Sequence, residues 1–217
     1  MNVNLDTKVK FTIDEILKNV YHLNFIGQLD LCSTFLRFQE YYESPKFKGT
    51  VFTLDEYIKW YSLPEIRGAF TYYTDWSGMN IPSYCLEPFF NGLFDPLTTR
   101  EQQILDVFDG KTGKYYIIGT HGKMKRSLKH EIAHALFYIS DEYQLESTAL
   151  LKDVKCNSFR SYLLRIGYDK DVMIDEIQAY LVSNINQFKD EADITPLLPF
   201  RDELEAIYRK YEHKYKK

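Results

Sequence analysis

Apolar residues recur at helical spacing along the first 68 positions of the chain. One such run follows Thr12, which can cap a helix, and acidic residues at positions 14 and 15 suit the positive end of a helix dipole. The pattern therefore predicts a helix over about 13–23. Two more helices are predicted over 29–42 and 54–61, the latter opened by Thr53. The expected core-facing residues of the first helix are Ile13, Ile16, Leu17, Val20 and Leu23.

The pattern changes between positions 69 and 120. Residues 69–74 are rich in aromatic and β-branched side chains and predict a strand, while a glycine and a proline indicate a loop over 75–83. Thr98 begins a Thr-Thr-Arg-Glu sequence of capping-box form, which predicts a helix through about residue 108. Residues 114–120 form the clearest predicted strand, because the segment is short and rich in aromatic and β-branched residues.

The last part of the chain predicts helices. Ser147 or Thr148 can cap a helix over 149–166, which Gly167 would end. Apolar positions at near-helical spacing predict another helix around residue 176, and a final helix is expected over 200–211. The expected fold class is therefore α+β: mostly helical, with a short sheet.

Composition excludes some classes of protein. The chain has 217 residues, 45% of them hydrophobic, enough for one domain over 1–217, with a helical part over 1–68 and a second part over 69–217, or for two tightly fused lobes. The net charge is −4, which gives no indication of a nucleic-acid partner. Oligomeric state is left open.

Other features bear on location. The three cysteines are scattered and odd in number, which favours a reducing compartment over a disulfide framework. The first residues lack a basic stretch followed by an apolar run, so we expect no signal peptide. Because no apolar run reaches the roughly eighteen residues of a spanning helix, we expect no membrane partner and a cytoplasmic location. Leaderless export would leave the same pattern.

The strongest chemical signal is His130-Glu131-Ile132-Ala133-His134, a His-Glu-x-x-His motif. In a helix the two histidines lie one turn apart on one face, where both imidazoles can reach a single metal ion. Glu131 would lie beside the ion and can take a proton from water there. No glycine or proline interrupts 124–140, so the required helix is expected. The competing interpretation is an ordinary helix with two hydrogen-bonded core histidines.

A catalytic zinc site takes three protein ligands, so a third is needed. Glu176 is the best candidate, because it lies among the apolar positions of a predicted helix and a buried glutamate needs a partner. Glu142 and Glu146 are rivals, but they follow His134 so closely that the chain would have to reverse almost at once. We therefore expect His130, His134 and Glu176 to bind the ion.

The two motifs together resemble the gluzincin branch of the zinc metallopeptidases. The resemblance rests on His130-Glu131-x-x-His134 and the helical segment Asp175-Glu176-Ile177-Gln178-Ala179-Tyr180, and it covers about residues 113–186. It implies a zincin-like fold with the sheet beside the histidine helix, a single Zn²⁺ and hydrolysis of peptide bonds. Many gluzincins carry an acidic residue four positions after the glutamate ligand, to orient a histidine. Here that position is Tyr180.

Further residues near these motifs have candidate roles. The Tyr180 hydroxyl can accept an imidazole N–H or donate to a developing oxyanion, and Tyr168 is a second candidate donor. Asp175 can orient a ligand histidine, or it can simply be an acid in the first turn of a helix. In the resembled family, the strand before the histidine helix is the sheet edge that binds substrate backbone. The strand over 114–120 can have that role or lie inside the sheet.

These observations predict a zinc-dependent endopeptidase acting on peptides or proteins. The zinc would make hydroxide available near neutral pH, with Glu131 as the general base and one tyrosine stabilising the oxyanion. The alternative is a non-catalytic or regulatory binding module that keeps a metallopeptidase fold. Hydrolysis of a non-peptide amide by the same site is also compatible with the sequence.

Overall fold

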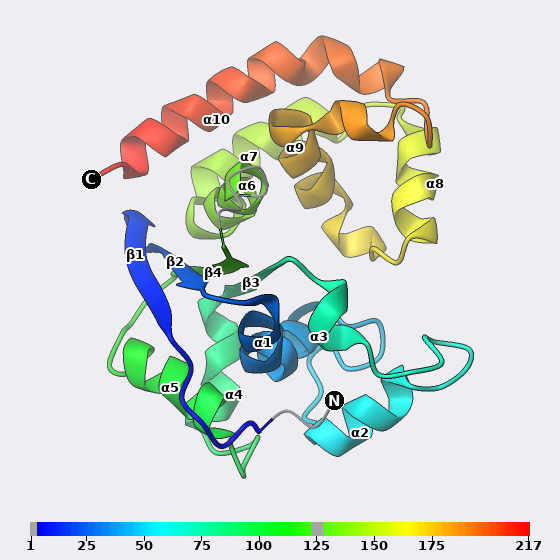
Figure 1. Cartoon of the computed structure of the whole chain (residues 1–217). Coiled ribbons are helices and arrows are strands. Elements are labelled where there is room, and N and C mark those ends of the chain that lie inside the picture. Colours follow the sequence, from blue (N-terminus) through cyan, green and yellow to red (C-terminus); the bar gives the residue numbers. More distant parts are fainter. Residues whose placement is uncertain (1–3, 123–127) are drawn as a thin grey trace. The chain divides into compact units, whose positions relative to one another are not determined.

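The computed structural model describes residues 4–122 and 128–217 (Figure 1). These residues form an α+β structure in which helices predominate and a small sheet has four strands. Contacts between residues divide the chain into two compact units. Unit 1 contains the described residues of 4–15 and 21–122, and unit 2 contains residues 16–20 together with 128–217. The single domain expected from the sequence stays a prediction.

The sheet has the strand order β1-β2-β4-β3. β3 and β4 are antiparallel, with Met79 opposite Gly119 and Ile81 opposite Ile117. The end of the β1–β2 hairpin, residues 16–20, is grouped with unit 2. The strands are β1 (Phe11–Leu17), β2 (Val20–Phe25), β3 (Gly78–Pro82) and β4 (Tyr116–His121).

Helix α1 (Gln28–Glu43) packs against β3 and β4 and covers one face of the sheet. The approach is so close that position 119 has no room for a side chain. A Cβ added to Gly119 would lie 2.6 Å from Leu31 Cδ1 and 3.0 Å from Phe35 Cε2. Glycine at this position therefore lets helix and strand pack with the density that protein cores require.

The hydrophobic core of unit 1 lies between this sheet face and its helices, and it is mostly aromatic. Two of these helices begin with complete capping boxes, in which Thr53 pairs with Glu56 and Thr98 pairs with Glu101. The helical segments besides α1 are α2 (Leu54–Tyr61), α3 (Tyr72–Asp75), η1 (Ser83–Leu86), α4 (Glu87–Phe90) and α5 (Thr99–Phe108).

A buried ion pair joins α1 to α5. The Arg37 guanidinium donates to both carboxylate oxygens of Glu101, with 2.7 Å between Nε and Oε1. It also donates to the carbonyls of Phe94 and Pro96, and Glu101 accepts a further hydrogen bond from the Thr98 N–H. Both charged groups are thus surrounded by partners of complementary character, which is the condition for burying them.

Unit 2 is helical apart from the hairpin end. Helix α6 packs along α9, and α7 and α10 each contact both of them (Figure 1). Among the described residues, no helix combines the length and the apolar character needed to cross a lipid bilayer. The helical segments are α6 (Leu128–Ile139), α7 (Asp141–Leu151), α8 (Asn157–Arg165), η2 (Lys170–Val172), α9 (Met173–Ser183), η3 (Ile185–Phe188), η4 (Thr195–Phe200) and α10 (Arg201–Tyr215).

The helix predicted over about 13–23 is wrong, because this segment forms the β1–β2 hairpin. Asn19 lies in the turn with a φ of 65°, a left-handed conformation that asparagine tolerates better than most residues and that interrupts a helix. In β2, Leu23 and Phe25 alternate with polar residues and belong to the core cluster. The same apolar residues fit both periods over a short segment, and pairing with β4 decides between them.

The predictions for 69–83 are also wrong. The segment read as a strand contains the short helix α3, and the segment read as a loop contains β3. Met79 and Ile81 alternate toward the core and pair with β4, whereas Tyr72 is fully buried from a helical turn. Glycine and proline here stand at the first and last positions of an edge strand, where the sheet tolerates them.

The helix predicted over 149–166 is wrong as a single element. It is two helices, because α7 ends at Leu151 and α8 begins at Asn157. The helices predicted over 29–42, 54–61 and 98–108 are confirmed as α1, α2 and α5, and the final helix is confirmed as α10, which runs further than expected.

The strand predicted over 114–120 is confirmed as β4, but it is not a sheet edge. It lies between β2 and β3 and is paired on both sides, so an added peptide backbone cannot pair with it. The outer neighbour β3 is partly closed as well: the outward N–H of Asn80 donates to Gln39 Oε1 of α1 at 2.9 Å. The suggestion that this strand binds substrate backbone is therefore wrong.

Candidate metal centre

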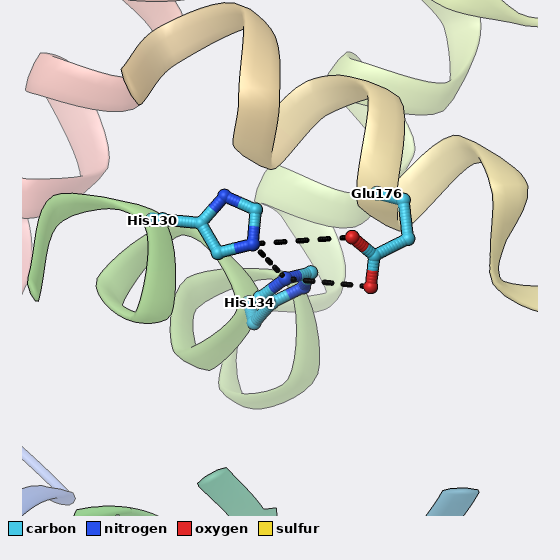
Figure 2. A group of neighbouring side chains, drawn as sticks. All are labelled: His130, His134 and Glu176. Atoms are coloured by element: carbon cyan, nitrogen blue, oxygen red, sulfur yellow. Dashed lines mark hydrogen bonds and ion pairs between the residues drawn. The ribbon is translucent and has the colours of Figure 1, made fainter. Parts of the chain in front are cut away.

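The His-Glu-x-x-His motif lies in the first two turns of α6. The helix begins at Leu128, so His130 and His134 are both within regular helix and project from the same face. Helix α9 packs against that face and carries Glu176 in its first turn. Figure 2 shows the three side chains pointing toward one another from the two helices.

The three predicted ligands lie together. The two Nε2 atoms of His130 and His134 are 3.0 Å apart. The Glu176 oxygens lie 3.9 Å from His130 Nε2 and 3.6 Å from His134 Nε2 (Figure 2). In a tetrahedral zinc site with bonds of about 2.1 Å, neighbouring donor atoms are about 3.4 Å apart. The spacing therefore suits one metal ion, and the group could hold one.

Hydrogen bonds to the outer ring nitrogens determine which atoms face the centre. His134 Nδ1 lies 2.8 Å from Asp175 Oδ1, and His130 Nδ1 lies 3.4 Å from Ser183 Oγ, while the His130 ring is also hydrogen-bonded to the backbone carbonyl of Ala179. Each oxygen acceptor requires a ring N–H, which leaves the Nε2 lone pairs directed inward. When both rings are neutral, two such lone pairs and a carboxylate at these distances repel one another unless a proton or a metal ion lies among them. The donor set therefore fits a metal ion.

The centre is buried, and its two imidazoles shift in opposite directions. Burial lowers the pKa of His130 well below its usual range, and the neighbouring His134 lowers it further. Burial also opposes the charged form of His134, but the carboxylates of Asp175 and Glu176 outweigh it and raise the pKa of His134 to about 10. In its metal-free form the centre thus attracts one positive charge, as a site built for a cation does.

Two tyrosines adjoin the histidines. The ring of Tyr180 packs on His130 with 4.4 Å between centroids, and its hydroxyl lies 2.8 Å from that of Tyr168. Burial, followed by the negative charge of Glu176, raises the pKa of Tyr180. Tyr180 therefore stays a neutral hydroxyl at physiological pH. It contacts a ligand histidine through its ring rather than accepting that histidine's N–H.

Glu131 is buried on α6 and interacts electrostatically with both His134 and Tyr180. The two rival carboxylates face away toward α10. Glu142 pairs with Lys214 at 3.3 Å, and Glu146 pairs with Lys210 at 2.7 Å. Among the described residues, His130, His134 and Glu176 form the one group of three or more metal-binding side chains with this geometry.

Two residues that the sequence did not indicate as part of the site, Gln178 and Tyr143, are linked to this centre through Asp175. Gln178 donates from Nε2 to Asp175 Oδ1 at 2.9 Å and accepts from the Tyr143 hydroxyl at 2.6 Å. Both side chains are fully buried. A glutamine among the apolar positions of α9 was the available signal, because a buried amide requires partners for its donors and acceptor.

Comparison with models of known protein families, with curated proteins and with solved structures gave no match. The geometry of the centre is therefore the basis for a proposed function.

Proposed function

We propose that this protein is a zinc-dependent endopeptidase with a zincin-like fold, similar in its mechanism to the gluzincins. The observation that carries the proposal is the convergence of His130, His134 and Glu176, with both Nε2 atoms facing the centre and His134 Nδ1 next to the Asp175 carboxylate. Two imidazoles and one carboxylate are a ligand set of catalytic zinc, which leaves the fourth position for water.

Glu131 is the proposed general base. A zinc ion held by the three ligands would supply Lewis acidity and lower the pKa of water in its fourth position toward about 7. Glu131 follows a ligand directly in the motif and interacts with His134, so it is well located to accept the water proton. It can later pass that proton to the leaving amine. Burial keeps bulk water from competing for its carboxylate.

Tyr168 and Tyr180 are the proposed donors to the oxyanion of the tetrahedral intermediate. Their hydroxyls are hydrogen-bonded to each other, and Tyr180 packs directly on His130. Either hydroxyl can donate to the other or to a substrate oxygen, and the raised pKa of Tyr180 keeps its proton in place for donation. We propose peptides or proteins as substrates, and the three buried free cysteines support a reducing compartment such as the cytoplasm.

Replacing Glu131 with glutamine tests the proposal. The amide keeps the shape of the side chain but cannot accept the proton, so zinc content should stay at one ion per chain while peptide cleavage falls about 10²- to 10⁴-fold. Metal analysis and an unbiased peptide library supply the two measurements. Glu142→Gln is the matched control, because Glu142 is exposed and pairs with Lys214, and its cleavage rate should equal that of the wild type.

Two outcomes would contradict the proposal. Wild-type cleavage by Glu131→Gln would exclude Glu131 as the base. A wild-type protein that binds zinc and cleaves no peptide in the library would instead identify a metal-binding module without peptidase activity.

A further inference from the structure

Behind His134 lies a chain of buried hydrogen bonds that the proposed catalytic steps do not use. It begins at Tyr143 on α7, whose hydroxyl donates to Gln178 Oε1. Gln178 Nε2 in turn donates to Asp175 Oδ1, and the same oxygen lies 2.8 Å from His134 Nδ1. This series of hydrogen bonds thus runs from α7 through α9 to the His134 ring nitrogen on α6.

Because the side chains of Tyr143 and Gln178 are buried, each hydrogen bond in the series has a fixed donor and a fixed acceptor. Tyr143 and Gln178 are both 0% exposed, so no solvent can substitute for their partners. The Asp175 carboxylate can only accept, so it takes a hydrogen from the Gln178 NH₂, which leaves Gln178 Oε1 to accept from the Tyr143 hydroxyl. The Asp175 carboxylate has no hydrogen to give and so accepts from both sides. His134 must therefore carry its hydrogen on Nδ1.

We infer that Asp175, oriented by Gln178 and Tyr143, is a positioning residue that fixes the His134 tautomer and directs its Nε2 lone pair at the metal ion. Asp175 would thus orient a ligand histidine, as the acidic residue four positions after the glutamate ligand does in many gluzincins. In this chain that later position is Tyr180, which contacts His130 through its ring. Asp175 directly precedes the ligand Glu176 on α9, so one helix supplies a ligand and orients another. This inference rests on the metal-binding part of the proposed function and is independent of peptide cleavage.

Asp175→Asn in the full chain is the principal test. An asparagine can present an N–H instead of an oxygen, which no longer selects the Nδ1–H tautomer. We expect its affinity for Zn²⁺, measured by competition with a chelator, to fall about 10- to 100-fold. Asp175→Glu, which keeps a carboxylate, should recover part of the loss. Asp171→Asn removes the same charge from an exposed position four residues earlier and should bind zinc like the wild type.

A second measurement reports the tautomer itself. Long-range ¹H–¹⁵N NMR correlations of the zinc-bound wild type should show His134 protonated at Nδ1, and Tyr143→Phe should weaken zinc binding relative to the wild type. These two measurements decide the matter if Asp175→Asn does not fold. Wild-type zinc affinity in a folded Asp175→Asn protein, or zinc bound to His134 through Nδ1 in the wild type, would overturn the inference. Absence of peptidase activity would not affect it.

Discussion

Unit 1 and unit 2 each bury ionisable side chains, but they do so in opposite ways. In unit 1, the Arg37 guanidinium meets the Glu101 carboxylate and two backbone carbonyls, so each donor faces an acceptor. In unit 2, two Nε2 atoms and a carboxylate face one another. The first arrangement is complete in itself and serves the fold. The second brings acceptors together and could hold a metal ion, which a structural ion pair could not.

The largest expected effect comes from breaking the pair in unit 1. Arg37→Met leaves Glu101 as an uncompensated buried charge, so we expect a loss of about 3–5 kcal/mol in the free energy of unfolding, measured with denaturant. Arg37→Met combined with Glu101→Leu removes both charges and should recover much of that loss. If the single variant is as stable as the wild type, the pair does not have the structural role described here.

A smaller effect is expected from adding the metal ion that unit 2 is proposed to bind. Free Zn²⁺ at 100 times its dissociation constant should raise the free energy of unfolding by about 2.7 kcal/mol, because it binds the folded chain. His134→Ala removes a ligand and should abolish the increase, whereas Glu146→Gln, whose carboxylate pairs with Lys210, should retain it. Thermal or chemical unfolding with and without zinc provides the measurement. Equal stabilisation of His134→Ala would place the ion elsewhere.

The smallest of the three effects concerns packing without charge. Gly119→Ala in β4 inserts a methyl group 2.6 Å from Leu31 Cδ1, and we expect a loss of about 1–3 kcal/mol in the free energy of unfolding. Gly113→Ala is a useful contrast, because that position has open space but a φ of 82°, so its cost would arise from the backbone alone. Neither change touches a proposed zinc ligand, so any zinc affinity of the wild type should persist in both variants.

The centre was more predictable from the sequence than the sheet. Two histidines four apart and a glutamate on an apolar helical face encode their geometry locally, and the described structure brings them together as expected. The capping residues Thr53 and Thr98 likewise specify their helix starts through local hydrogen bonds. Such signals are short-range, so one sequence suffices to recognise them.

The errors occur where partners distant in sequence decide the structure. The apolar residues of 13–23 suit a helix or a strand, and pairing of β2 with β4, almost a hundred positions later, selects the strand. The role of Gln178 could not be predicted for a similar reason. It depends on hydrogen bonds to Tyr143, which is distant in sequence, and to Asp175, and only the fold brings these side chains together. The zincin-like architecture and the zinc itself stay predictions that the experiments above address.

The side-chain amide of Gln39 has a consequence for the protein in solution. Gln39 Oε1 accepts the outward N–H of Asn80 in the edge strand β3. That N–H is therefore not available to pair with a strand of a second molecule. Helix α1, which packs against β3, thus also protects this edge strand from pairing between molecules. A concentrated sample should therefore resist aggregation through β3.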